Sequence, residues 1–146
     1  AVVHDEDSVG RVTRLGQEYW LGDQDRRVLL EGVRTAARIY FAAGAEAVVA
    51  GIHGPGSIHR EGDIDRLLND EIPAWQLALY AAHPMGTCRM GTNPSTSVVD
   101  PDGRVWGWDN LHVADASVFP TSLGVNPQVT TYAVGLTIGA AVAEAA

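Results

Sequence analysis

The last twenty residues of the chain, PQVTTYAVGLTIGAAVAEAA, constrain its fold more than any other segment. They contain one charged residue, Glu144, and small or apolar side chains cover nearly the whole circumference of the helix that they predict. Pro127 suits the first turn of this helix, because its missing N–H would have no partner there. A helix without a polar face is normally buried, so we expect other elements to cover it on several sides.

The amino-acid composition of the chain changes near residue 83. Thirteen of the eighteen acidic residues lie between Asp5 and Glu71, and the next stretch, HPMGTCRMGTNPSTS, is rich in the residue types of loops. We therefore divide the chain into residues 1–82 and residues 83–146. Helical and strand patterns occur in both parts, which indicates the α+β class.

In the first part, residues 2–21 are predicted to form a hairpin or a meander of strands. Residues 22–44 have apolar side chains at helical spacing. Asp23 is a candidate N-cap of that helix, although Arg26 stands where a capping box would have Glu. Gly44 supplies its C-terminal stop.

Further along, residues 46–52 indicate a short strand. Residues 62–80 indicate a second helix, which Pro73 interrupts or restarts because proline cannot continue a helix interior. In the second part, SVVDPDGRVW predicts two short strands around a PDG turn, and LHVADAS predicts another strand.

Composition excludes several classes of partner. The net charge of −8 argues against nucleic acid and against an anionic membrane surface, since both attract basic patches. The single cysteine, Cys88, forms no internal disulfide and no multi-cysteine zinc site. No run of about 18 apolar residues predicts a transmembrane helix, so we expect a cytoplasmic protein. All ten basic residues are arginine, which indicates a GC-rich coding genome and a bacterial source.

His83 is the first candidate for chemistry. It lies where a predicted helix meets a loop, and Pro84 and Gly86 make an abrupt turn that can aim a side chain into a cavity. Imidazole has a free pKa of about 6.5, which suits proton transfer at neutral pH. A histidine with a purely structural role is the alternative, and the residue alone does not separate the two.

Asn126 is the second candidate, at the head of the terminal helix. One interpretation is an ordinary Asn N-cap. The other uses the unpaired N–H groups and positive dipole of a helix N-terminus, which stabilise an anion such as a phosphate or a reduced flavin. Thr130 and Thr131 add hydroxyl groups in the first turn.

Asp115 is the third candidate. It ends the predicted strand LHVAD, and small residues follow it, as is typical of ligand contacts in α/β folds. A turn-former or a cap for the next element is an equal alternative. A metal site from His53 and His59 is rejected, because their spacing gives no helix face and no further ligand is near. Met85 and Met90 are predicted to pack rather than to bind metal.

Three ordered blocks, HPMGTCRMG, SVVDPDGRVWGWDNLHVADASVFP and NPQVTTYAVG, resemble the C-terminal signature of the glucose–methanol–choline flavoprotein oxidoreductases. The resemblance covers the chain well from His83 to its end. It is looser before that point, where the helix of residues 22–44 is similar to those of bacterial long-chain-alcohol or sterol-type members.

The resemblance implies a role for each matching position. His83 would act as base or hydrogen-bond partner toward a substrate hydroxyl. Asn126 would be the second catalytic residue, at a position that is His or Asn in the family. Asp115 and Ala116 would lie close to FAD, and Pro127 and Thr130 would lie against the flavin ring. The implied reaction is hydride transfer from the carbinol carbon of a small-molecule alcohol to flavin N5.

One departure from the family pattern matters. Family members carry a Gly-rich dinucleotide-binding βαβ unit, and no G-x-G-x-x-G after a strand occurs here. The chain also starts without Met, so we expect a portion of a longer protein: part of the substrate-binding region in residues 1–82, and the last strand and helix of the FAD domain in residues 83–146.

It follows that an N-terminal FAD-binding segment is an expected partner. The isolated chain should bind FAD weakly or not at all, and apolar surface left uncovered could drive its self-association. The alternative function is a non-enzymatic binding module that keeps the scaffold without flavin. Retention of both His83 and Asn126 favours the enzyme.

Overall fold

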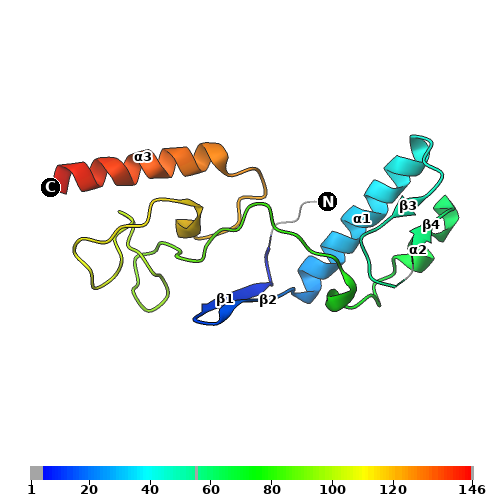
Figure 1. The fold of residues 1–146 in the computed structure, drawn as a ribbon, viewed down its shortest axis with the longest axis horizontal. Helices are drawn as coiled ribbons and strands as arrows, with labels where there is room; N and C mark the ends of the chain where they lie inside the picture. Colours follow the sequence, from blue (N-terminus) through cyan, green and yellow to red (C-terminus); the bar gives the residue numbers. More distant parts are fainter. Residues whose placement is uncertain (1–4, 55, 146) are drawn as a thin grey trace. The chain divides into compact units, whose positions relative to one another are not determined.

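The computed structural model describes residues 5–54 and 56–145, and the chain divides into two compact units, Ala1–Tyr80 and Ala81–Ala146 (Figure 1). Helices alternate with two separate two-stranded sheets, each antiparallel, in the first unit. The mixture of helix and strand is consistent with the predicted α+β class.

A hairpin opens the first unit. Strands β1 (Val9–Thr13) and β2 (Gly16–Trp20) pair antiparallel around a two-residue turn, and the Thr13 hydroxyl closes the turn by donating to the Gly16 carbonyl. This confirms the hairpin predicted for residues 2–21 as far as the structure describes them; residues 2–4 lie outside the described residues.

Helix α1 (Asp23–Ala42) confirms the helix predicted for residues 22–44. Gly44 follows it with a φ of 92°, a backbone conformation that glycine adopts without steric cost, and so ends the helix as predicted. The N-cap position belongs to Gly22, which has no side chain to cap with. The prediction that Asp23 is the N-cap is therefore wrong by one residue.

The cap of α1 comes from a distant segment instead. The carboxylate of Asp7 accepts the backbone N–H groups of Gln24 and Asp25, each at 3.0 Å. In return the carboxylate of Asp25, which is 2% exposed, accepts the backbone N–H groups of Glu6, Asp7 and Ser8. The pattern is that of a capping box, formed between segments 17 to 19 residues apart rather than within one turn.

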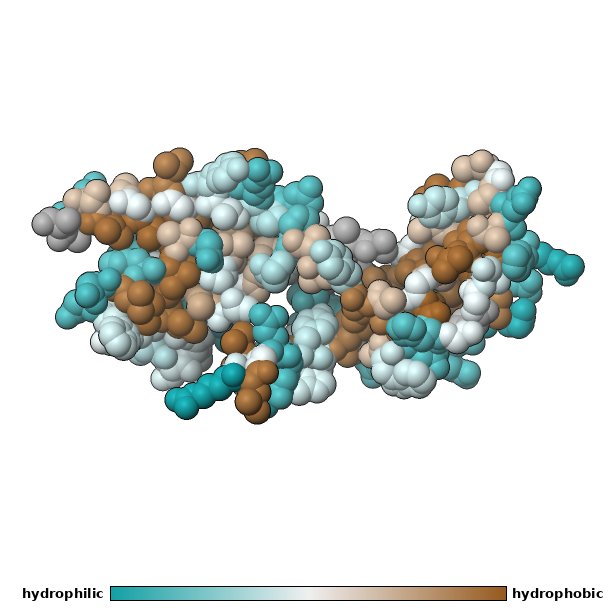
Figure 2. Space-filling view, viewed as in Figure 1, coloured by the Kyte–Doolittle hydropathy of each residue, from teal (hydrophilic) through white to brown (hydrophobic). Residues whose placement is uncertain are grey.

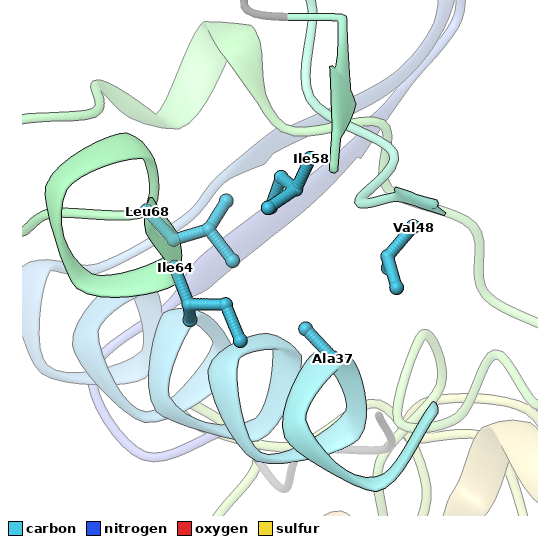
Figure 3. Packing of buried hydrophobic residues seen from close by; sticks show 5 residues of the cluster. All are labelled: Ala37, Val48, Ile58, Ile64 and Leu68. Carbon is cyan, nitrogen blue, oxygen red and sulfur yellow. The ribbon is translucent and has the colours of Figure 1, made fainter. Parts of the chain in front are cut away.

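The core of the first unit lies between α1 and the segments that follow it. Strand β3 (Val48–Val49) pairs with β4 (Ser57–Ile58), which confirms the short strand predicted within residues 46–52. The short helix α2 (Ile64–Leu67) covers the same side. Side chains from these elements point toward one another in Figure 3: Ala37, Val48, Ile58, Ile64 and Leu68.

The second helix predicted for residues 62–80 is largely wrong. Helix occurs only in α2 and in two short 3₁₀ turns, Glu61–Asp63 and Ala74–Gln76. The side chain of Asn69 explains the early end, because its amide donates to the Arg66 carbonyl and its carbonyl accepts the Glu71 N–H. Such local bonds compete with helix propagation.

In the second unit, residues 83–97 form the predicted loop. The expected strands around the PDG turn reduce to isolated bridges, Val99 with Val105 and Arg104 with His112. The strand predicted at LHVADAS is wrong, since only His112 bridges and a 3₁₀ turn, η3 (Ala116–Val118), begins within it.

Helix α3 (Gln128–Ala145) confirms the terminal helix but not its burial. Ile138 is its one buried residue among the described ones, and it packs with Val99, Val118 and Phe119. The rest of α3 is half-buried or exposed, and apolar surface is visible along it in Figure 2. The predicted cover on several sides is wrong for this chain, because the second unit contacts one side of the helix.

Candidate active site

The N-terminus of α3 carries Asn126, but not as its cap. The Pro127 carbonyl accepts the N–H of Thr131 at 2.8 Å and its hydroxyl at 2.9 Å, so Pro127 occupies the N-cap position, one residue before the position predicted for it. Asn126 is exposed, and its side chain has no hydrogen-bond partner among the residues that the structure describes. The interpretation of Asn126 as an ordinary N-cap is therefore not supported.

Asp115 caps the 3₁₀ turn η3. Its Oδ1 accepts the N–H of Ser117 at 2.8 Å and the Ser117 hydroxyl at 2.5 Å. These two bonds hold the pKa of the Asp115 carboxyl below its ordinary value. Asp115 thus caps the next element and does not end a strand, and its contact with a ligand stays a prediction.

The η3 turn joins two of the three sequence blocks. Its successive carbonyls, those of Ala116, Ser117 and Val118, accept backbone N–H groups from alternate residues of the HPMGTCRM block. The donors and distances are Gly86 at 3.3 Å, Cys88 at 2.9 Å and Met90 at 2.8 Å. The loop that follows His83 is thus fixed along η3 by main-chain bonds between segments about thirty residues apart.

Glycine is required where this loop meets η3. Gly86 has a φ of 77°, and a Cβ at this position would lie 3.2 Å from the Phe119 carbonyl oxygen. Any other residue would strain the backbone and press on the segment that follows η3. The abrupt turn predicted after His83 is therefore present at Gly86.

A depression of about 510 Å³ lies beside the N-terminal half of α3. Its lining joins the helix to the segment before Asp115: Ala114, Thr131, Tyr132, Gly135 and Leu136. Small residues face one another across it, since a Cβ on Gly135 would lie 3.6 Å from the Ala114 carbonyl oxygen. The depression therefore has mostly apolar walls, and Asp115 and the first turn of α3 adjoin its lining residues in the sequence.

The structure places the predicted residues at the heads of two elements, and their convergence on one site stays a prediction. Asp115 and Ala116 lie at the head of η3, and Pro127 and Thr130 lie at the head of α3, beside the depression that Ala114 and Thr131 line. His83 is exposed and has no hydrogen bond within the described part of the chain. Its convergence with Asn126 on one cavity stays a prediction.

Ser117 was not predicted from the sequence as a site residue, and neither was the hydrogen bond that the Thr131 hydroxyl donates to the Pro127 carbonyl. A Ser two residues after an Asp is a known signal of a local cap, and it could have identified Ser117.

A second groove, in the first unit, was not predicted from the sequence. It measures about 280 Å³, and most of its lining is apolar: Leu29, Val33, Ala50, Gly51, Leu77, Ala78, Leu79 and Tyr80.

No group of three or more His, Cys, Asp or Glu side chains that could hold a metal ion occurs among residues 5–54 and 56–145. His53 and His59 are both exposed there. None of the helices in the described chain has both the length and the apolar character needed to cross a membrane.

Comparison with known sequences gives a consistent picture. The family model described as GMC oxidoreductase matches residues 7–135. A long-chain-alcohol oxidase of Arabidopsis thaliana is 39% identical over 137 residues, covering 84% of this chain and 18% of that protein. A second long-chain-alcohol oxidase of the same plant is 33% identical over 157 residues, covering 99% of this chain and 20% of that protein.

An uncharacterized GMC-type oxidoreductase of Sinorhizobium fredii is 39% identical over 101 residues, covering 69% of this chain and 20% of that protein. The chain thus spans about a fifth of the length of the curated relatives that it matches. Relatives come from a plant as well as from bacteria, so these comparisons do not support the expectation of a bacterial source.

Proposed function

This chain belongs to the GMC oxidoreductase family, and from that premise we propose that it is the C-terminal catalytic portion of an FAD-dependent alcohol oxidoreductase. The observation that carries the proposal is the N-terminus of α3. It leaves its first N–H groups without a side-chain cap, and Asn126, Pro127 and Thr130 lie at that end of the helix.

The residues present fit FAD. A flavin is a flat ring with an apolar face and a polar edge that becomes anionic on reduction. The depression beside α3 offers Tyr132 and Leu136 as apolar walls, and Ala114 and Gly135 leave room for close approach. The N–H groups at the head of α3 favour negative charge. Asp115, Ala116, Pro127 and Thr130 would hold the cofactor, which when bound supplies a hydride acceptor.

The chain's own residues would handle the substrate oxygen. An imidazole nitrogen of neutral His83 takes the proton of the hydroxyl group, which requires that His83 be deprotonated beforehand. The amide N–H of Asn126 donates a hydrogen bond to the same oxygen as negative charge develops on it. The main-chain bonds from Gly86, Cys88 and Met90 to η3 hold the loop that carries His83.

Most of FAD would be held elsewhere. Since the chain has no Gly-rich βαβ unit, we propose that an N-terminal FAD-binding segment of the same protein supplies the pyrophosphate site. Residues 1–82 would then contribute to the substrate-binding region, and residues 83–146 would complete the FAD domain. The isolated chain would retain little flavin.

We propose a long-chain alcohol as substrate. Two relatives are named long-chain-alcohol oxidases, and most residues that line the groove in the first unit have apolar side chains that could contact an aliphatic chain. Leu29, Val33 and Leu77 form part of that lining. Each methylene removed from water contributes about 0.8 kcal/mol, so affinity should rise with chain length. A non-enzymatic module is not favoured, because the relatives that match include named oxidases.

The test uses the full-length protein loaded with FAD. His83→Ala should lower turnover of a long-chain alcohol by about 10²–10⁴, the usual contribution of a general base. His53→Ala and His59→Ala are matched controls, because both histidines are exposed and lie in the other unit. Steady-state rates decide: similar losses in all three variants would remove His83 from the mechanism, and no alcohol oxidation by the wild type would overturn the proposed function.

A further inference from the structure

The hydrogen bonds around η3 point to a residue that the family match does not single out. Ser117 makes two bonds to Asp115 and, through its carbonyl, a third to the loop after His83. It is the one residue of the described chain that contacts both the proposed FAD carboxylate and the proposed catalytic loop by hydrogen bonds. We propose that Ser117 is a positioning residue, which fixes the loop carrying His83 relative to Asp115.

The η3 turn depends on Asp115 and Ser117 for its shape. A 3₁₀ turn of three residues has poor hydrogen-bond geometry and little stability of its own. In η3, the backbone N–H and the hydroxyl group of Ser117 both donate hydrogen bonds to Oδ1 of Asp115. A charged acceptor makes these the strongest hydrogen bonds of the turn, so Asp115 and Ser117 together determine its shape.

The loop after His83 depends on the shape of η3. The carbonyls of Ala116, Ser117 and Val118 can accept from Gly86, Cys88 and Met90 only while the turn keeps its shape. The bond nearest His83, from Gly86 to Ala116, is also the longest at 3.3 Å. Loosening the turn should therefore release the His83 end of the loop first.

Asp115 uses only one of its two carboxylate oxygens for the turn. Both bonds from Ser117 go to Oδ1, and Oδ2 has no hydrogen-bond partner among the described residues. One carboxylate oxygen is thus used for the turn while the other remains available to a ligand. Ser117 would then orient Asp115 toward the cofactor and hold the His83 loop at the same time.

The experiment compares Ser117→Ala with wild type in the full-length protein loaded with FAD. Loss of one hydrogen bond to a partly exposed carboxylate should lower kcat/KM for an alcohol by about three- to tenfold. Peptides covering residues 84–91 should exchange their amide hydrogens faster, and this readout needs no activity.

Matched variants isolate the hydroxyl group. Ser117→Thr keeps it and should restore the wild-type values within about twofold, whereas Ser117→Val has the same shape without it and should behave like Ser117→Ala. This pair decides the question even where the Ala variant does not fold. Ser95→Ala is the control, because Ser95 is exposed and its hydroxyl has no hydrogen bond in the described chain.

Two results would overturn the inference: unchanged exchange over residues 84–91 in Ser117→Ala, or equal behaviour of the Thr and Val variants. A loss of kcat/KM without faster exchange also overturns it, because Ser117 would then act by another route. The activity arm rests on the proposed function and the exchange arm does not. An inactive wild type with the expected exchange pattern would therefore reject the proposed function and still support Ser117 as the residue that positions the loop after His83.

Discussion

At the N-terminus of α3, Asn126 presents an amide that caps no backbone group of the described helix. A polar side chain without a structural partner beside an uncapped helix end is available for a ligand. We expect Asn126→Ala to lower kcat of the full-length enzyme by about 10²–10³, the loss typical of one donor to a developing oxyanion. Steady-state kinetics would measure it.

The control for Asn126 is Asn110→Ala, since Asn110 is exposed and has no side-chain bond in the described part of the second unit. The resemblance allows His at the second catalytic position, so Asn126→His should retain more activity than Asn126→Ala. An Asn126→Ala enzyme with wild-type kcat would leave the amide without a catalytic role.

Asp25 is a residue of stability rather than of chemistry. Burial alone would raise the pKa of its carboxyl, but bonds from the Ser8 hydroxyl and the N–H groups of Glu6, Asp7 and Ser8 outweigh burial and lower it. A lowered pKa stabilises the fold above the unfolded value of about 3.9, and this stabilisation is lost as the pH falls through the folded value.

We therefore expect Asp25→Asn to destabilise the chain by about 1.5–3 kcal/mol at neutral pH, the range for hydrogen bonds to a charged group. The difference from wild type should shrink below about pH 4. Denaturant unfolding at several pH values would measure it. Asp23→Asn, which alters an exposed carboxylate on the same helical turn, should cost at most about 1 kcal/mol. A difference that stays constant down to low pH would contradict the reciprocal cap.

Among the elements, α3 depends on one close approach. Gly103 has a φ of 77°, and a Cβ there would lie 2.6 Å from Cδ1 of Ile138 and 2.8 Å from the Val113 carbonyl oxygen. Gly107 has a φ of 81° with nothing within 4 Å. The two glycines share the backbone strain of substitution, but only Gly103 touches the helix.

This pair gives a matched test of α3 packing. Gly107→Ala should cost about 1–2 kcal/mol from left-handed strain alone. Gly103→Ala should cost about 1–3 kcal/mol more than Gly107→Ala, because a methyl group is forced into a packed contact. Denaturant unfolding followed by circular dichroism would compare them. Equal losses of stability would show that Ile138 and α3 accommodate the added methyl group without any cost in folding free energy.

The elements predicted well from sequence are those with local signals. The hairpin has its turn, and α1 has helical periodicity and Gly44. The elements predicted wrongly depend on individual hydrogen bonds, some local and some distant, that residue periodicity does not reveal. Asn69 ends α2 early, and the segment predicted as a strand before Asp115 instead turns into η3, whose carbonyls bind the loop after His83.

The candidate site divides in the same way. Residue types and order could identify His83, Asn126 and Asp115 as candidates. Sequence could not tell that Asn126 is not a cap or that Ser117 joins two blocks, because both depend on backbone geometry. The Asp7 cap of α1 was hidden for the same reason, since its partners are 17 and 18 residues away.

At the scale of the whole molecule, α3 was predicted to be buried on several sides, and a row of its apolar side chains is exposed instead. Val129, Tyr132 and Leu136 are 79%, 62% and 76% exposed. Their spacing of three and four residues places them on one face of the helix. In the full-length protein we expect the flavin and the proposed FAD-binding segment together to cover this apolar row. In the isolated chain the row remains in contact with water, which favours association.

We therefore expect the isolated chain to self-associate through the apolar row of Val129, Tyr132 and Leu136. Its mass by sedimentation velocity should rise with concentration, and Leu136→Glu should shift it toward the monomer, because a charge in an apolar contact must be desolvated. Thr137→Glu adds the same charge to the same helix and leaves the row intact, so it should behave like wild type. A wild-type chain that stays monomeric at every concentration, or equal effects of the two Glu variants, would show that α3 is not the surface through which the chain associates.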